Sequence, residues 1–293
     1  MAWFKQDCWR QITSTIALFL MVVMTGRQCE ANTTAPSWNY QAGDVKGPEN
    51  WYLNYPDCDG VMQSPINIVT NETVQDKTLQ EFDLTDYTIT DGVKMKMENV
   101  GGHTAEVVYA GKDVILKGGS LPAKYKLRQF HFHWGGNTSL GSEHSIDGRY
   151  SALEMHLVHT QIRFETVTDA SCKPFGLAVL AVLIEVGRRN KNFDVIINNL
   201  SKIPKAYDEI EIDSFAVRDL LPSAPLKYYR YYGSLTTPPC CESVIWSVAV
   251  KKVQISADQL NAFRSLLDDE DKQLVDDYRF LQNLNSRTVL LTV

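Results

Sequence analysis

Two histidines stand one residue apart in the segment QFHFHWGG, residues 129–136, where a β-strand would ordinarily carry Val, Ile or Thr. On a strand, side chains at i and i+2 project from one face about 6 to 7 Å apart. His131 and His133 would therefore point together, with Phe130 and Phe132 on the opposite face. This spacing suits a metal chelate, but it also suits strand histidines that bond to backbone groups. A third ligand must decide between the two interpretations.

The segment LEMHLVHT, residues 153–160, offers two further histidines. If it is a strand, Glu154 and His156 share one face and His159 takes the other, so only one histidine can join the first pair. If it is a helix, the two histidines are neighbours at i and i+3 and could form a site of their own. The β-rich surroundings favour the strand, and therefore His156.

Each of two candidate ligands has a hydrogen-bonding residue two positions earlier: Gln129 before His131, and Glu154 before His156. Such groups can accept the second ring N–H and fix the tautomer of the histidine. Three neutral histidines leave one tetrahedral position of zinc open, which is typical of a catalytic site. Zinc there acts as a Lewis acid that makes hydroxide available near neutral pH.

That hydroxide needs an orienting group. Glu143 in GSEHS and Thr236 in SLTTPP could supply it, with a buried carboxylate that accepts from the threonine hydroxyl. Either residue alone would be interpreted as a surface or turn residue. We expect the other two histidines, His144 and His159, to have structural roles.

The elements that must position these residues are mostly strands. Apolar and polar residues alternate with period two in several segments bounded by Gly, Asp and Asn, which indicates strands. These segments cover residues 93–100, 103–110, 113–119, 126–134, 152–159 and 176–187. Helical periodicity occurs in residues 192–203 and 256–267, with Ser256 as a plausible N-cap. No repeat or linker divides the chain after residue 38, so we expect one mostly β (α+β) domain over residues 38–293.

The amino-acid composition limits the classes to which this protein can belong. The 293 residues are 44% hydrophobic and carry a formal net charge of −6, without a Lys/Arg block, which argues against a nucleic-acid surface. Lys5 and Arg10 precede an apolar run, IALFLMVVM, that is too short for a comfortable membrane span. We therefore expect a signal peptide over 1–31, a flexible leader over 32–37 and a secreted protein with no membrane span after cleavage. An uncleaved signal anchor is the alternative.

The remaining cysteines and the glycosylation signals fit secretion. Cleavage leaves Cys58, Cys172, Cys240 and Cys241, for which three complete pairings are possible. N-x-S/T sequons occur at four positions. They are Asn32, Asn71, Asn137 and Asn199. The oligomeric state cannot be read from the sequence.

Taken in order, these motifs resemble an α-class carbonic anhydrase of the secreted type over residues 38–290. The carrying segments are GPENW, QSPINI, GGHTAEV, QFHFHWG, GSEHSIDG, LEMHLVH, GLAVLAV and YGSLTTPPCCESVIW. The resemblance implies a large, mainly antiparallel twisted central sheet with short peripheral helices. It also implies reversible, zinc-dependent hydration of carbon dioxide to bicarbonate, with a small molecule as the substrate.

Residue by residue, the resemblance implies Zn²⁺ ligands His131, His133 and His156, oriented in part by Gln129 and Glu154, and a relay of Glu143 and Thr236. It implies His103 as the proton shuttle, with Tyr40 near the water chain, and a Cys58–Cys240 disulfide. The implied substrate-binding residues are Val158, Val179, Leu235, Thr236, Thr237, Val244 and Trp246.

The chain departs from the family pattern in a few places. Phe280 stands where Pro is usual, Asp277 where Asn is common, and both Cys172 and Cys241 are unusual. None of these removes a ligand, although Asp277 could alter the polar rim and the turnover rate. The alternatives are a catalytically weak or inactive binding or matrix protein on the same fold, and a metal-dependent hydrolase of another class.

Overall fold

The computed structural model describes residue 35 and residues 37–293, and Pro36–Val293 forms one compact unit. The expected signal peptide and Asn32 lie outside the described residues. Within these residues, no helix is both long and apolar enough to cross a membrane.

The described chain is built mainly from strands, with a few short helices between them. The strands are β1 Asn67–Ile68, β2 Val74–Asp76, β3 Phe82–Asp83, β4 Val93–Asn99, β5 Ala105–Gly111, β6 Ile115–Gly118, β7 Tyr125–Trp134, β8 Ser145–Ile146, β9 Leu153–Gln161, β10 Leu177–Val186, β11 Glu209–Ile212, β12 Tyr228–Gly233, β13 Val244–Ala249, β14 Val253–Ile255 and β15 Leu290–Thr292. The α-helices are α1 Val167–Ser171, α2 Asp194–Leu200 and α3 Ala257–Phe263. Short 3₁₀ helices cover Trp51–Leu53, Pro56–Asp59, Thr70–Glu72, Thr85–Thr88, Lys191–Phe193 and Val217–Leu220.

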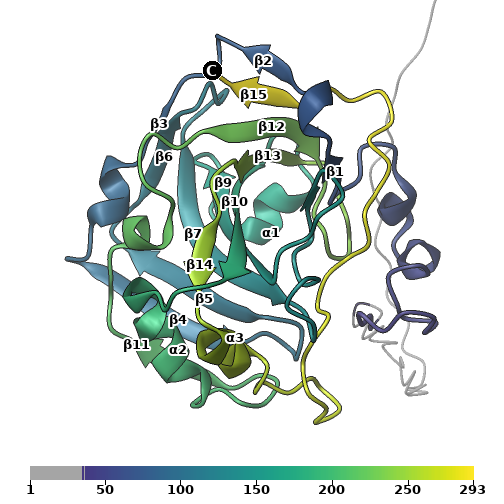
Figure 1. Ribbon diagram of the computed structural model, residues 1–293, viewed down its shortest axis with the longest axis vertical. Coiled ribbons are helices and arrows are strands. Elements are labelled where there is room, and N and C mark those ends of the chain that lie inside the picture. The colour runs from purple at the N-terminus through teal and green to yellow at the C-terminus, as the bar shows by residue number, and fades with distance from the viewer. Residues whose placement is uncertain (1–34, 36) are drawn as a thin grey trace, which may run out of the picture. The chain divides into compact units, whose positions relative to one another are not determined.

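One large sheet carries almost all of these strands, in the order β11-β4-β5-β7-β9-β10-β13-β12-β15-β2, with β6 and β14 branching from β7 and β10. The long strands at its centre are antiparallel, but β10 pairs in parallel with β13 and β14, and β15 pairs in parallel with β2. The sheet is therefore mixed. Figure 1 shows β7, β9 and β10 in the middle of the fold and α2 beside α3 near β4 and β11.

The strands and helices predicted from periodicity are confirmed, with shifts at their ends. For example, the segment 93–100 forms β4, and the segment 256–267 contains α3. The hydroxyl of Ser256 accepts from the backbone N–H of Gln259, and the Gln259 side chain accepts from the N–H of Ser256. This reciprocal capping satisfies two backbone donors and explains why the helix begins there.

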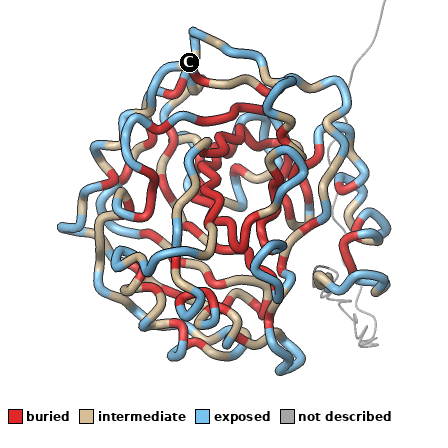
Figure 2. Tube along the Cα trace, viewed as in Figure 1, coloured by how far each residue is buried: buried red, intermediate tan, exposed pale blue. Residues whose placement is uncertain are grey.

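The two faces of the sheet pack against different apolar clusters. One cluster contains alternate residues of the central strands together with the apolar faces of α2 and α3, including Phe130, Phe132, Leu157 and Phe263. The other includes Val158, Val179 and Trp246. Figure 2 shows that the buried segments gather in the central strands. Both faces of β9 are consequently buried, and this burial holds the histidine-bearing strands rigidly.

A β-bulge in β7 decides which face carries the histidines. β7 pairs antiparallel with β9, and the register shifts between Leu127 and Gln129, so Arg128 has no opposite residue. Leu127 packs in the large core, whereas Gln129, His131 and His133 lie on the opposite face. Without the extra residue, the strict period of two would place all of these side chains on the face of Leu127.

Candidate metal centre

Three histidines from two adjacent strands meet on one face of the sheet. His131 and His133 lie on β7, and His131 is directly opposite His156 of β9. Residues directly opposite each other in an antiparallel pair share a face, so the three imidazoles converge. Their ligand nitrogens all lie within 4.8 Å of one another. The structure thus brings together the three residues predicted as metal ligands.

Each ring uses its other nitrogen for a hydrogen bond. Nδ1 of His131 donates to Oε1 of Gln129 at 2.8 Å, and Nε2 of His156 donates to Oε1 of Glu154 at 2.7 Å. Nδ1 of His133 donates to the backbone oxygen of Asp277 at 2.7 Å. These bonds leave Nε2 of His131, Nε2 of His133 and Nδ1 of His156 for a metal.

The donor set fits zinc. Nε2 of His133 is buried and has no hydrogen-bond partner among the described residues, which is costly unless a ligand occupies the position. Three neutral imidazole nitrogens, each fixed by a hydrogen bond at the opposite ring nitrogen, are the usual ligands of catalytic zinc. The residues present therefore suit the metal that the sequence implies.

The electrostatics keep these ligands neutral and their carboxylate partner ionised. Burial, together with the neighbouring His133 and His156 rings, holds the pKa of His131 well below its ordinary value. Burial also lowers the pKa of His133. Burial alone would raise the pKa of Glu154, but the facing His144 and His156 and their hydrogen bonds hold it well below the ordinary value. Neutral histidines are the form that binds metal, so the local field favours a loaded site.

Glu143 lies beside the histidines but is not joined to Thr236. Its Oε1 accepts from the backbone N–H of Arg279 at 2.9 Å, and its Oε2 is 3.6 Å from Nε2 of His133. That Oε2 has no hydrogen-bond partner in the described part of the chain, and no hydrogen bond there links it to the buried Thr236. Glu143 is near the ligands, and its relay with Thr236 stays a prediction.

Asp277 contacts the site through its backbone. Besides the carbonyl bond to His133, its Oδ1 accepts from the backbone N–H of Trp134. Its Oδ2 is buried without a partner among the described residues. Burial raises the pKa of Asp277 well above its ordinary value, and the nearby Glu143 adds to the effect. Burial therefore favours the protonated form of this side chain.

The residues predicted to hold the substrate form one apolar wall. Val158 of β9, Val179 of β10 and Trp246 of β13 are directly opposite one another across neighbouring strands, in the same row as Gln129. Val244 belongs to the same buried cluster, and Leu235 packs against it. Thr237, also predicted here, is partly buried and accepts a backbone hydrogen bond from Cys240. The row of Gln129 and Val158 lies two residues along the strands from the row of His131 and His156, and substrate binding there stays a prediction.

His103 lies in the turn between β4 and β5, against the N-terminal segment. Its ring stacks on Trp38 with centroids 4.0 Å apart, and Tyr40 is edge-on at 6.2 Å. Burial lowers the pKa of His103, although Asp268 and Asp269 oppose this shift. Gly102 has φ +76°, and a Cβ there would lie 2.4 Å from the backbone N of Asp269. Only glycine allows this close approach of the acidic loop to His103.

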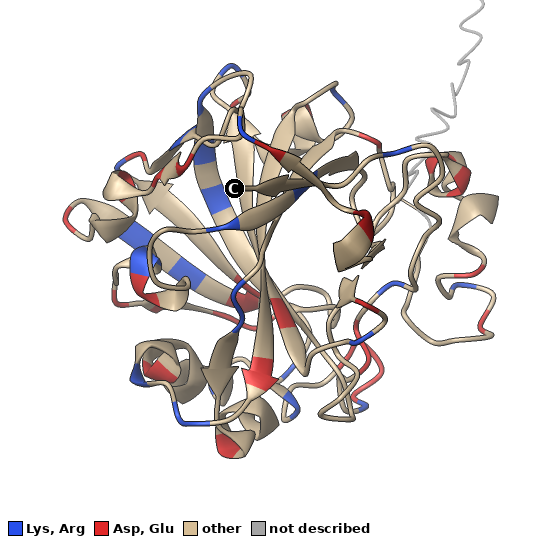
Figure 3. Ribbon diagram, turned by 45° about the horizontal axis from the view of Figure 1, so that its top comes forward, with Lys and Arg blue, Asp and Glu red and all other residues tan. Residues whose placement is uncertain are grey.

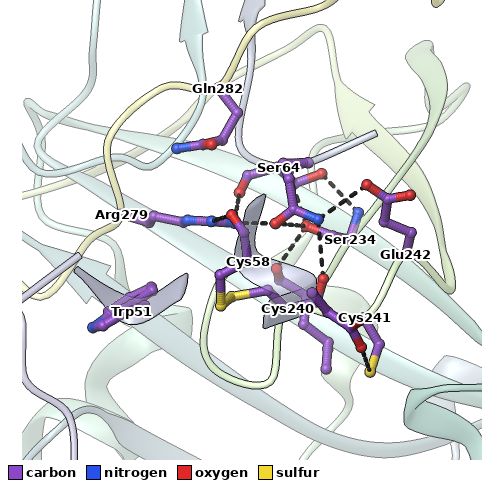
Figure 4. Close-up of a disulfide and its surroundings, with 12 residues drawn as sticks. Trp51, Cys58, Ser64, Ser234, Cys240, Cys241, Glu242, Arg279 and Gln282 are labelled. Atoms are coloured by element: carbon purple, nitrogen blue, oxygen red, sulfur yellow. Dashed lines mark hydrogen bonds between the residues drawn. A yellow bond between two sulfur atoms is a disulfide. The ribbon is translucent and has the colours of Figure 1, made fainter. Parts of the chain in front are cut away.

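Two disulfides hold the loop that carries Thr236. The predicted Cys58–Cys240 bond is confirmed, and Cys172 pairs with Cys241, which the sequence left open. Figure 4 shows the first bond beside Arg279, whose guanidinium donates to the carbonyls of Ser64 and Cys58. The backbone N–H of Leu235 also donates to the carbonyl of Cys241. These links fix both ends of the loop 235–241.

The remaining histidines have the structural roles that were expected. His144 donates from Nδ1 to Glu154 and lies 2.7 Å from the Tyr231 hydroxyl through Nε2. His159 faces the large core, where it contacts the Tyr87 hydroxyl and the carbonyl of Ala178. Neither ring is available to the cluster of ligands, because both nitrogens of each are already bonded.

Among the described sequons, Asn71 and Asn137 are exposed, whereas Asn199 is partly buried in α2. Nδ2 of Asn199 donates to the carbonyl of Val195. Asn71 and Asn137 are therefore better placed for a glycan, and glycosylation stays a prediction. Phe280, the other departure, is 40% exposed and lines the same pocket as Tyr40 and His103.

Sequence reasoning missed two features of this site. The partner of the His133 ring is a backbone carbonyl 144 positions away, which leaves no side-chain signal. Glu106 of β5 is directly opposite His131 and was not considered. The alternation in GGHTAEV could have indicated it, because Glu106 occupies a polar position between the apolar Ala105 and Val107.

Charged residues of both signs are distributed around the described chain (Figure 3).

Comparisons with known proteins agree on one family. The model of the family described as eukaryotic-type carbonic anhydrase matches residues 46–293. Carbonic anhydrase 7 of Mus musculus is 36% identical, over 91% of this chain and 98% of its own. Carbonic anhydrase 12 of Homo sapiens is 33% identical, over 96% of this chain and 80% of its own. Carbonic anhydrase 3 of Homo sapiens is 34% identical, over 87% of this chain and 98% of its own.

Proposed function

Because the chain belongs to the eukaryotic-type carbonic anhydrase family, we propose that it catalyses the reversible hydration of carbon dioxide with zinc held by His131, His133 and His156. The observation that carries this proposal is the convergence of three imidazoles whose ligand nitrogens lie within 4.8 Å of one another. Bound there, zinc would supply a Lewis acid that makes hydroxide available near neutral pH.

The chain's own residues position the reactants. Val158, Val179 and Trp246 form an apolar wall that holds uncharged carbon dioxide beside the ligands and excludes water. Glu143 and Thr236 orient the nucleophile toward it. Both lie on segments fixed from outside the sheet, Glu143 by the N–H of Arg279 and Thr236 by the disulfide-linked loop.

His103 exports the proton that each hydration leaves behind. Imidazole has an ordinary pKa of about 6.5, and although burial lowers the pKa of His103, the facing Asp269 and Asp268 oppose that shift, so the ring can accept a proton and pass it to buffer. The ring of His103 is partly exposed, and it rests on Trp38 rather than in the ligand cluster. Its partial exposure supports the shuttle role, because the ring can exchange protons with buffer.

Stopped-flow carbon dioxide hydration on zinc-loaded protein tests the proposal. His156→Gln removes one ligand, and His159→Gln is the matched control, because His159 is on the same strand but faces the core. We expect one zinc per chain and full turnover in the wild type and in His159→Gln, with most of both lost in His156→Gln. A fully loaded wild type that hydrates no faster than buffer would refute the function.

We also propose that residues 1–31 are a cleaved signal peptide and that the enzyme is secreted. The two disulfides support this, since such bonds persist in oxidising compartments and are rare in the cytosol. Expression in a secreting eukaryotic cell should release into the culture medium a protein that begins at Asn32. An intact N-terminus on membranes would instead indicate the signal anchor.

A further inference from the structure

A row of acidic residues runs along the sheet toward the metal centre. Glu209 of β11 is opposite Glu98 of β4, Glu98 is opposite Glu106 of β5, and Glu106 is opposite His131 of β7. Directly opposite residues share a face, so all of these side chains are on the face that carries the ligands. Glu106 is the member of the row nearest to His131.

Glu106 differs from its neighbours because it has no partner. The ammonium of Lys96 is 2.7 Å from Glu98 and 2.6 Å from Glu209, so those two carboxylates are paired. Among the described residues, Glu106 makes no hydrogen bond and no ion pair, although most of its surface is covered. A carboxyl group with a purely structural role in such a place would normally be paired or hydrogen-bonded.

Glu106 is also not a fourth ligand. Among the described residues, His131, His133 and His156 form one of three groups whose possible ligand atoms lie within 4.8 Å of one another, and Glu106 belongs to none of these groups. Lys96 forms ion pairs with Glu98 and Glu209 but not with Glu106, so the carboxylate of Glu106 is not neutralised by a partner on the ligand-bearing face.

We propose that Glu106 is a specificity-determining residue that weakens the binding of anions at the metal centre while leaving access of uncharged carbon dioxide unhindered. This inference rests on the proposed function. The substrate of hydration carries no charge, whereas bicarbonate and inhibitory anions do, so a fixed carboxylate one strand away acts on them selectively. It favours release of bicarbonate and raises the concentration of other anions needed to occupy the site.

The expected size follows from Coulomb's law. For two unit charges about 10 Å apart at an effective dielectric constant of about 20, removal of one charge should strengthen anion binding by roughly tenfold. Glu98 is one strand further away and is paired with Lys96, so its removal should change anion binding by less than about twofold.

Binding of thiocyanate to cobalt-substituted protein tests this without an activity measurement. The visible spectrum of cobalt reports the dissociation constant, and the measurement is made at pH 8.5, well above the ordinary pKa of a carboxyl group. We expect Glu106→Gln to bind thiocyanate about tenfold more tightly than the wild type. Glu106→Asp, which keeps the charge, and Glu98→Gln, the matched control, should remain near the wild-type value.

Equal dissociation constants for the wild type and Glu106→Gln would overturn the inference, as would an equally large change in Glu98→Gln. A wild type that binds no cobalt would overturn both this inference and the proposed function. A wild type that binds cobalt and thiocyanate but does not hydrate carbon dioxide would refute the proposed function alone, and the comparison of variants would still decide the role of Glu106.

Discussion

The Cys172–Cys241 disulfide should contribute strongly to the stability of the fold. The double variant Cys172→Ser/Cys241→Ser measures that contribution. The bond joins residues 69 positions apart, from the end of α1 to the loop that carries Thr236. Closing a loop of this length lowers the entropy of the unfolded chain by an amount worth about 4 kcal/mol at 25 °C. Serine at 241 can donate to Oδ2 of Asp57, which lies 3.5 Å from Sγ, so loss of the cross-link should dominate.

Urea unfolding under non-reducing conditions measures this contribution. The variant should lose about 4 kcal/mol of unfolding free energy, equivalent to roughly 8 to 16 °C in Tm for a domain of this size. Its m-value should rise, because an unfolded chain with one fewer cross-link exposes more surface.

Full reduction provides the internal control. With both disulfides opened, the wild type and the double variant should unfold at nearly the same urea concentration. They then differ only in the serine oxygens that replace the cysteine sulfurs at positions 172 and 241. A loss below about 1 kcal/mol, or a loss that persists after reduction, would refute the assignment of stability to the cross-link. The second outcome would point to native contacts of the sulfurs.

Three further predictions concern single side chains around the metal centre. Glu154→Gln should weaken zinc binding by about 10- to 100-fold in a chelator competition, because the His156 ring loses its charged acceptor; a change below about threefold would contradict this. His103→Ala should lower kcat by about tenfold or more in dilute buffer, with kcat/KM nearly unchanged and added imidazole restoring turnover; a parallel fall in kcat/KM would exclude the shuttle role. The raised pKa of Asp277 means that the folded state holds a proton that the unfolded state releases, so stability falls as pH rises above about 4. Asp277→Asn should accordingly be as stable as the wild type near pH 4 and about 1 to 3 kcal/mol more stable at pH 8 by denaturant titration, and a constant difference across that range would count against the mechanism.

The local relations within each element follow from the order of neighbouring residues alone. The i, i+2 spacing placed His131 with His133, and Gln129 with His131, because a strand repeats every two residues whatever it packs against. The same alternation separated His156 from His159 once the segment was taken as a strand. The capped start of α3 at Ser256 is likewise a property of neighbouring residues.

The face that each residue occupies and the partners that it meets depend on the packing of segments far apart in the chain. The bulge at Arg128 turns Gln129 and the two histidines away from the face of Leu127, and the pairing of β7 with β9 creates it, not the local alternation of residues. The carbonyl that holds His133 comes from Asp277, and Cys172 meets Cys241 across 69 positions. Periodicity is set by the geometry of one strand, whereas register, bulges and cross-links depend on how distant segments pack.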